Sequence, residues 1–251
     1  MANPQVRAYA TPVPPLPPLL KVLDRRCKGD SRLKIQKTNP VPSPDPAVLF
    51  PRALSKLHSI WLSYTYPFHS LGKNFYAHYS ADIRRPVTPH IKIGDDVFLD
   101  RDVWLNIPYV PENTDPVIIL EDECKIGRRA MISAKNRIHV GRQTAFAPNV
   151  LLMDHNHAFE DVTIAIGWQG ITQGGTIRIE EGCLLGYGVA VVCSKGELVI
   201  GKNSVIGANS VVTRSIPPYS VVSGNPGRVV KQFDPSKGQW LIGMSGVATK
   251  D

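Results

Sequence analysis

Two histidines stand two residues apart in the segment Leu151-Leu152-Met153-Asp154-His155-Asn156-His157, where an apolar run gives way to polar residues. Imidazole is the side chain whose ordinary pKa suits proton transfer near neutral pH, so this segment is a candidate for acid–base chemistry. A histidine that directly follows a rigid strand would be held at the edge of a loop, against any groove there. An ordinary surface pair without a role fits the same spacing, and both interpretations stay open at this point.

The element that would position this segment is indicated by apolar residues that recur every six positions. Neither a helix, with a period of about 3.6, nor an amphipathic strand, with a period of 2, gives this spacing. A coil of short strands joined by tight turns does, with one large and one small side chain of each strand pointing inward, which predicts a β-solenoid. The large positions are Ile93, Leu99, Leu105, Leu120, Ile126, Ile132, Ile138, Val140, Phe146, Leu152, Ile179, Leu185, Val191, Ile200, Ile206 and Val212.

Three regions are expected along the 251 residues. Residues 1–70 combine a proline-rich basic arm with a short amphipathic helix, residues 71–231 form the solenoid, and residues 232–251 form a tail. Polar insertions at 106–117 and 153–176 interrupt the repeat. Insertions in a solenoid map to loops on one face, often the binding face, and the second insertion begins beside the two histidines.

The amphipathic helix is expected from Ala47 to about Tyr66. Its apolar face is predicted to pack on its own solenoid or on a neighbouring subunit; the alternative is that the helix and the basic arm contact a membrane. The apolar residues at helical spacing are Leu54, Leu57, Ile60, Trp61 and Tyr64.

The net charge of +8 is concentrated near the N-terminus. Residues 1–60 contain ten Lys or Arg and three Asp, so the solenoid is near neutral and is not expected to bind nucleic acid. We see no apolar run long enough to span a membrane, no secretory leader, and no CxxC spacing among the four cysteines. We therefore expect a cytoplasmic protein with reduced thiols, in which Cys124 and Cys183 fill small inward positions.

The chain resembles the hexapeptide-repeat acyltransferases over residues 71–231. The resemblance rests on the repeat, on Asp-His-Asn-His at the start of an insertion, and on the closing segment Ile200-Gly-Lys-Asn-Ser-Val-Ile-Gly-Ala-Asn-Ser-Val-Val-Thr-Arg-Ser-Ile-Pro-Pro-Tyr-Ser-Val-Val-Ser-Gly-Asn-Pro-Gly-Arg-Val-Val-Lys231. Within this family the chain is similar to the galactoside, maltose, NodL-type and xenobiotic O-acetyltransferases, especially to members that acetylate surface polysaccharides. The resemblance implies an all-β, left-handed parallel β-helix assembled as a homotrimer with active sites between subunits.

The resemblance also implies a mechanism. In the family, a histidine at this position removes the proton from an acceptor hydroxyl, whose oxygen attacks the thioester of acetyl-CoA directly. The matching residue is His155, with His157 as an acceptor contact or substitute base. Asp154, or the pair Glu160 and Asp161, would orient the ring and favour the imidazolium formed during catalysis. Acetyl-CoA is thus the expected cosubstrate, and no metal is expected.

The cosubstrate is expected to lie along the C-terminal coils. Family members bind its pantetheine arm through backbone amides there and its phosphates through cations of the exit segment. Arginine suits phosphates because its planar fork donates paired, charge-assisted hydrogen bonds. The matching positions are Gly188, Ala208, Thr213, Arg214, Arg228 and Lys231.

The acceptor is expected to contact the second insertion, where Trp168 could stack on a sugar face and Gln169 or Gln173 could bond hydroxyls. The long basic arm departs from the acetyltransferases of small sugars, which favours a surface glycan or its precursor as the acceptor. Further candidates near the first insertion are Asp102, Trp104 and Asn106.

Three other functions stay open. N-acylation of an amino-sugar nucleotide would use the same base and thioester. A metal enzyme of the γ-class carbonic anhydrase type would use His139 and His157, which are one solenoid turn apart, together with a third histidine and an open coordination position. A non-catalytic scaffold would keep the solenoid without turnover.

Overall fold

The computed structural model describes residues 46–113 and 115–242, which belong to one compact unit of the chain. The basic arm expected before residue 46, Cys27 within it, and residues 243–251 of the expected tail lie outside the described residues.

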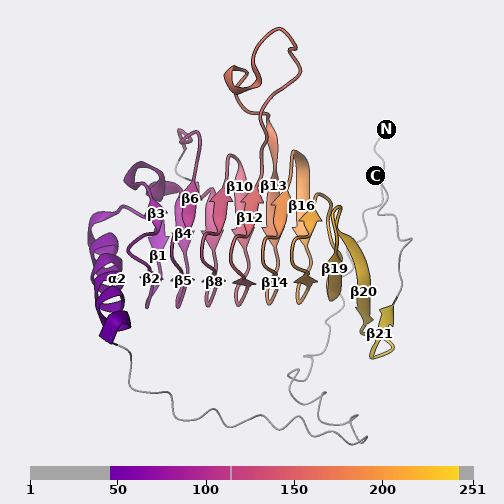
Figure 1. Cartoon of the computed structure of the whole chain (residues 1–251), viewed down its shortest axis with the longest axis horizontal. Helices are drawn as coiled ribbons and strands as arrows, with labels where there is room; N and C mark the ends of the chain where they lie inside the picture. The colour runs from indigo at the N-terminus through magenta and orange to yellow at the C-terminus, as the bar shows by residue number, and fades with distance from the viewer. Residues whose placement is uncertain (1–45, 114, 243–251) are drawn as a thin grey trace, which may run out of the picture. The chain divides into compact units, whose positions relative to one another are not determined.

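The described strands form a three-sided parallel coil, with one strand of each turn in each of three sheets (Figure 1). The first sheet contains β1 (Ser70–Leu71), β4 (Ile91–Ile93), β7 (Ile118–Leu120), β10 (Arg137–Val140), β13 (Gly174–Ile179) and β16 (Lys195–Ile200). The second contains β2 (Tyr76–Ala77), β5 (Phe98–Leu99), β8 (Lys125–Ile126), β11 (Ala145–Phe146), β14 (Leu184–Leu185), β17 (Val205–Ile206), β19 (Ser220–Ser223), β20 (Arg228–Asp234) and β21 (Gln239–Ile242). The third contains β3 (Asp82–Ile83), β6 (Trp104–Asn106), β9 (Met131–Ser133), β12 (Leu151–Met153), β15 (Ala190–Val192) and β18 (Val211–Val212).

The six-residue period is the distance from one sheet to the next along the chain. Parallel pairing aligns equivalent positions of successive coils, so that Leu99 lies beside Ile126 and Leu105 beside Ile132. All the large inward positions predicted from the sequence are buried and pack in one continuous core. Cys124 and Cys183 are buried among them, and burial raises the pKa of these thiols to about 12 and about 11, which keeps them protonated and unreactive.

The corners between sheets need a residue in the left-handed backbone region. Asn149, Asn203 and Asn209 occupy it with φ of 62°, 53° and 57°, and Gly188 does so with φ of 67°. Asparagine and glycine tolerate this conformation best, which explains why they recur at these corners.

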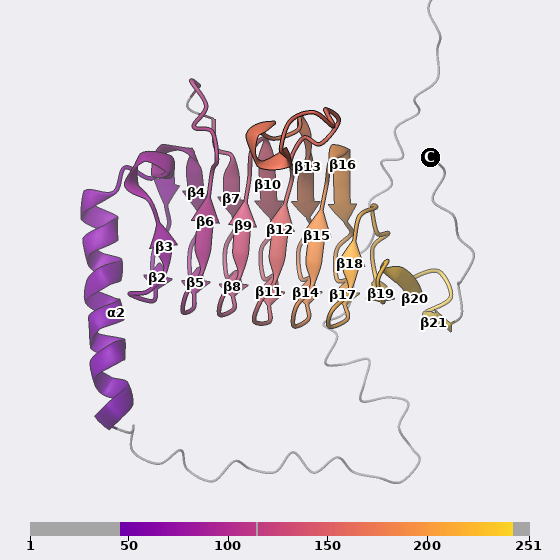
Figure 2. The same ribbon diagram turned by 45° about the horizontal axis from the view of Figure 1, so that its top comes forward.

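The helix α2 (Pro46–Thr65) covers one end of the solenoid (Figure 2). It contacts the edge strand β2, whose outer backbone groups have no further coil to pair with. Ser59 Oγ accepts the N–H of Ala77 at 2.9 Å, and Ser55 Oγ accepts that of Tyr79 at 3.3 Å. The helix thereby supplies the acceptors that a preceding strand would have supplied.

The docked face of α2 differs from the predicted one. Ser55, Ser59 and Leu62 are buried against the solenoid, whereas the apolar face expected to pack there is exposed. The prediction that this face packs on the chain's own solenoid was wrong, because the edge of β2 needs hydrogen-bond acceptors, which serine provides and leucine does not. The packing of this face on a neighbouring subunit stays a prediction. The residues left exposed are Leu54, Leu57, Ile60, Trp61 and Tyr64.

We predict that Ser59→Ala lowers the free energy of unfolding by about 1–3 kcal/mol, because the buried N–H of Ala77 loses its acceptor. Chemical denaturation measures this loss. Ser63→Ala is the matched control, since Ser63 Oγ is exposed and bonds only to the carbonyl of Ser59 in its own helix. Equal stabilities of the two variants would contradict the role given to Ser59.

The second sheet continues past Val212, where the repeats were expected to end. β19 pairs in parallel with β17, and the hairpin β20–β21 then adds two antiparallel strands. The hexad does not predict these strands, because antiparallel hairpin residues are not constrained to the inward spacing of a coil.

Two loops and two short 3₁₀ helices complete the described chain. Helix η1 (Arg85–His90) precedes β4, residues 107–117 join β6 to β7, and residues 154–173 join β12 to β13. The last of these contains η2 (Ile166–Trp168) and projects from the solenoid (Figure 1). Within the described residues, no helix has the length and apolar character needed to cross a lipid bilayer.

Candidate active site

Asp154 is fully buried where the chain leaves β12, and backbone amides of the preceding coil hold its carboxylate. Oδ1 accepts the N–H of Lys135 at 2.7 Å, while Oδ2 accepts those of Asn136 at 2.8 Å and Arg137 at 2.9 Å. Three backbone donors around one carboxylate fix its position, and both of its oxygens act as hydrogen-bond acceptors. The turn from β9 to β10, which supplies these amides at residues 135–137, therefore holds the Asp154 carboxylate in place at the base of the loop.

His155 is oriented by that carboxylate. Its Nδ1 lies 3.0 Å from Asp154 Oδ1, and its side chain is only 8% exposed. An ionised carboxylate can only accept, so Nδ1 carries the proton and Nε2 is left as the basic nitrogen. His155 Nε2 has no hydrogen-bond partner among the described residues. The one side-chain nitrogen or oxygen there that is both fully buried and unpaired is His58 Nδ1, so His155 Nε2 is not fully buried. Nε2 therefore keeps access to an approaching group.

The stem of the loop is closed by hydrogen bonds next to these two residues. Asn156 N–H donates to Thr172 Oγ1 at 3.0 Å, and Asn136 Nδ2 donates to the carbonyls of Gln173 at 2.8 Å and Gly175 at 2.9 Å. Gly174 has φ of 74°, and a Cβ there would lie 2.4 Å from the carbonyl oxygen of Asp154. Only glycine fits this approach, so the return strand passes directly against the Asp154–His155 pair.

Other loop residues predicted for the site have different positions. His157 is exposed on the stem, in a bridge with Ile171. Asp161 accepts the N–H and the hydroxyl of Thr163, and it makes no hydrogen bond with His155. Gln169 bonds to the carbonyls of Asp161 and Ile164 and to the N–H of Asp161, so its amide holds the loop rather than facing outward.

The remaining predicted acceptor residues fall into three settings. Trp168 is 87% exposed on η2, and the side chain of Gln173 is exposed beside the stem. Asp102 lies at a corner with φ of 57°, with its carboxylate 3.8 Å from Arg129 Nε, and Trp104 is half-buried in β6. None of these side chains has a hydrogen bond or ion pair with His155 among the described residues, and their part in binding the acceptor stays a prediction.

Asn106 is the middle residue of a chain of side-chain hydrogen bonds that ends beside the site. Its Nδ2 donates to Ser133 Oγ at 2.9 Å, and its Oδ1 accepts from Arg84 at 2.9 Å. Ser133 precedes the turn that holds Asp154, and its register partner in the next coil is Met153. Sequence reasoning missed Arg84, Ser133 and the amides of residues 135–137. The coil before Asp154 is 20 residues long (153 − 133), so counting back an ideal 18-residue turn would not give the correct register.

The C-terminal candidates lie on the coils that follow. Gly188 and Ala208 occupy the same corner of successive coils, where Asn209 N–H donates to Tyr187 O at 2.7 Å. Gly227 N–H donates to Val211 O at 2.7 Å, which brings the start of β20 beside the end of β18. Exposed residues at this end of the solenoid are Thr213, Arg214, Arg228 and Lys231.

The metal alternative lacks its ligand set within the described residues. No group of three or more His, Cys, Asp or Glu side chains is placed to hold a metal ion there. His139 Nε2 instead lies 2.7 Å from Glu121 Oε1, in a hydrogen bond beside the first sheet.

Comparison with known proteins shows which fold this chain shares and which enzymes its sequence resembles. No family model matches the chain. Among solved structures, AntD, an N-acyltransferase from Bacillus cereus in complex with dTDP and 3-hydroxybutyryl-CoA, superposes with a TM-score of 0.56 at 18% identity over 72% of this chain and 89% of AntD. This likeness shows the fold and confirms the predicted left-handed parallel β-helix.

The curated relatives are acetyltransferases. The chain is 28% identical over 130 residues to the putative lipopolysaccharide biosynthesis O-acetyl transferase WbbJ of Escherichia coli, covering 49% of this chain and 65% of WbbJ. It is 33% identical to the probable acetyltransferase Rv3034c of Mycobacterium tuberculosis, covering 44% of this chain and 35% of the relative. It is 34% identical to serine acetyltransferase of Staphylococcus aureus, covering 43% and 46%. The matches thus span less than two thirds of each of these relatives.

Proposed function

We propose that this chain transfers an acetyl group from acetyl-CoA to a hydroxyl of a sugar in a surface polysaccharide or its precursor, in the cytoplasm. The observation that carries this proposal is His155, buried beside a carboxylate that three backbone amides hold in place. The relatives support the reaction class: WbbJ is described as a lipopolysaccharide O-acetyl transferase, and AntD was solved with an acyl-CoA.

His155 is proposed as the general base. Its Nε2 accepts the proton of the acceptor hydroxyl while the oxygen attacks the carbonyl carbon of the thioester. Asp154 stabilises the imidazolium that forms, because it accepts from Nδ1 in either state of the ring. As the tetrahedral intermediate collapses, the carbon–sulfur bond breaks, the electron pair stays on sulfur, and the imidazolium returns its proton to give free CoA thiol.

A thiol-release assay tests the function. Acetyl-CoA is offered with a panel of free sugars, nucleotide sugars, amino-sugar nucleotides and glycan fragments, and CoA thiol is followed with a chromogenic disulfide. Acceptor-dependent release with a hydroxyl-bearing glycan, and O-acetyl product by mass spectrometry, are expected. Release with no acceptor of the panel would count against the proposal, and release only with amino sugars would favour N-acylation, the chemistry of AntD.

The C-terminal cations are proposed to hold the phosphates of acetyl-CoA. Arg214 and Arg228 are exposed and make no ion pair among the described residues. Arg228 Nη1 donates to the carbonyl of Gly227 at 3.0 Å, which leaves its other N–H groups to bind phosphate. We predict that Arg214→Gln and Arg228→Gln each raise the KM for acetyl-CoA by about tenfold or more with little change in kcat. Steady-state kinetics measure this, with Lys125→Gln as a charge-matched control from β8; an unchanged KM would contradict the assignment.

The chain is further proposed to act as a homotrimer with sites between subunits. The loop that begins at His155 exposes Phe159, Val162 and Trp168, which are 63%, 95% and 87% exposed. Apolar side chains of this size at a loop tip favour burial against another surface. Light scattering of the purified protein gives the assembled mass, and a monomer would contradict this part of the proposal.

A further inference from the structure

The side of α2 that faces away from the solenoid is apolar and largely exposed; Trp61 on it has ring contacts with His58 at 5.9 Å and with Tyr66 at 5.1 Å. Its side chains recur at intervals of four and three, so they form one stripe opposite Ser55, Ser59 and Leu62. Phe50, Leu57 and Tyr64 are 74%, 64% and 88% exposed. We call this stripe the outer face of α2; it consists of Phe50, Leu54, Leu57, Trp61 and Tyr64.

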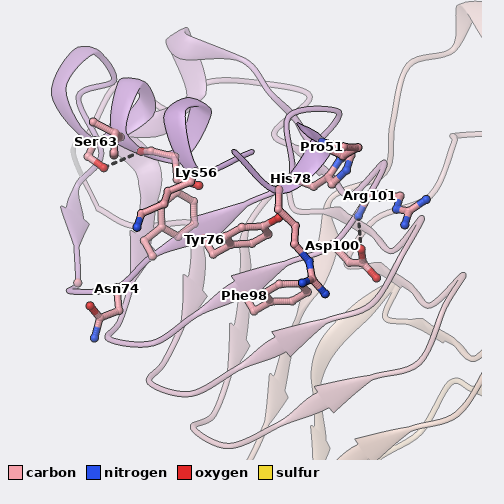
Figure 3. Close-up of a pocket in the computed structure, with 14 residues that line it drawn as sticks. Pro51, Lys56, Ser63, Asn74, Tyr76, His78, Phe98, Asp100 and Arg101 are labelled. Atoms are coloured by element: carbon pink, nitrogen blue, oxygen red, sulfur yellow. Dashed lines mark hydrogen bonds between the residues drawn. The ribbon is translucent and has the colours of Figure 1, made fainter. Parts of the chain in front are cut away.

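The flank of α2 between its two faces is basic. Arg52 and Lys56 are exposed, make no ion pair among the described residues, and belong to a helix that contains no Asp or Glu. With Arg101 they line a cavity of about 780 Å³ between α2 and the first coils. Figure 3 draws Lys56 on the helix side of this cavity and the rings of Tyr76 and Phe98, stacked at 4.8 Å, on the sheet side. Asp100 is the one acidic side chain of the lining, and its Oδ1 accepts the N–H of Arg101.

The charges decide between the possible occupants of the outer face. A second copy of α2 would supply apolar side chains but no acid to pair with Arg52 and Lys56, since the helix contains no Asp or Glu. The sequence directly before α2 adds to this charge, since residues 1–45 contain eight Lys or Arg and three Asp. A surface with an apolar interior beneath a layer of negative charge would match both the apolar outer face and the cations beside it.

We propose that α2 lies in the headgroup region of an anionic lipid bilayer, with its outer face toward the acyl chains and Arg52, Lys56 and Arg101 toward lipid phosphates. An apolar stripe with aromatic residues, flanked by cations, is the pattern by which a helix lies in a membrane surface without spanning it. The solenoid would then stand on the bilayer by the end that α2 covers (Figure 2). This inference does not depend on the proposed function, because it concerns binding alone.

Vesicle sedimentation of the full chain tests the proposal. We expect the protein to sediment with mixed phosphatidylglycerol–phosphatidylcholine vesicles at low salt, and more weakly with pure phosphatidylcholine or at about 0.5 M salt. The double variant Leu57→Glu with Trp61→Glu should lower binding by at least about tenfold, and Arg52→Gln with Lys56→Gln by a similar factor. Matched controls are Ile242→Glu, an exposed apolar residue on β21, and Lys125→Gln on β8; both should bind as the unmodified chain does.

A second readout locates α2 at the surface. Tryptophan emission should shift to the blue on adding anionic vesicles and be quenched by lipids brominated on the acyl chains, and Trp61→Phe should remove most of both effects. Far-ultraviolet circular dichroism and an unchanged thermal unfolding temperature confirm that the variants fold. The proposal is wrong if the chain binds no vesicle, if the outer-face variant binds as well as the controls do, or if that variant instead changes the mass by light scattering, which would make the outer face a subunit contact.

Discussion

Replacing His155 by alanine is expected to reduce kcat for acetyl transfer by about 10²–10⁴-fold, because the acceptor hydroxyl loses the group that takes its proton. The KM for acetyl-CoA should change little, since the proposed phosphate contacts lie on later coils. Thermal unfolding should stay close to that of the unmodified chain, because His155 makes one side-chain hydrogen bond and leaves Asp154 with its three backbone donors.

His157→Ala is the control for this substitution. His157 is two residues away, exposed, and held in the loop stem through its backbone bridge with Ile171. Its removal should lower activity by less than about tenfold if it only contacts the acceptor. The reverse result, with His157→Ala inactive and His155→Ala active, would show that the base is assigned to the wrong ring.

Asp154→Asn is expected to have an effect of similar size for a different reason. An amide nitrogen at the position of Oδ1 would donate to His155 Nδ1, which moves the ring proton to Nε2 and leaves no basic nitrogen facing the acceptor. In the general pattern of carboxylate-oriented histidines, such a change of tautomer costs up to about 10⁴ in kcat. The same amide nitrogen would also face the backbone N–H of Lys135, which would lose its acceptor, so the variant should unfold at lower temperature.

Two measurements separate orientation from a simple loss of folding. kcat and the KM for acetyl-CoA are measured well below the unfolding transition, and circular dichroism there should match the unmodified chain. Asp161→Asn provides a control within the same loop, because that carboxylate is exposed and bonds only to Thr163. Full activity of Asp154→Asn would refute the orienting role of the buried carboxylate.

The solenoid could be predicted from the sequence because its rule is local and repeated. One inward side chain per strand is enough to fix the period, and the predicted positions from Ile93 to Val212 are buried as expected. The outward side of α2 could not be predicted in the same way. Its apolar stripe has the ordinary helical spacing, and nothing in that spacing shows that serine hydroxyls would dock the helix by accepting from the edge of β2.

The candidate site likewise contains contacts that follow from neighbouring residues in the sequence and contacts that depend on the folded structure. Asp154 and His155 are adjacent in the chain, so their pairing could be expected from the sequence. The amides of Lys135, Asn136 and Arg137 reach Asp154 from the preceding coil, and this contact depends on how coils stack around an irregular loop. The engagement of Gln169 within its own loop likewise follows from the loop's fold, which has no repeat to predict it.

The two ends of the second sheet have a consequence for solubility. Nothing in a stack of equivalent coils limits its length, since the edge strand of the last coil can pair with another strand through its free N–H and C=O groups. Here α2 satisfies the first coil with serine oxygens, and the hairpin β20–β21 reverses the chain direction after the last. Both terminations make the ends of the second sheet unlike its middle, which disfavours the end-to-end addition of further molecules along this sheet.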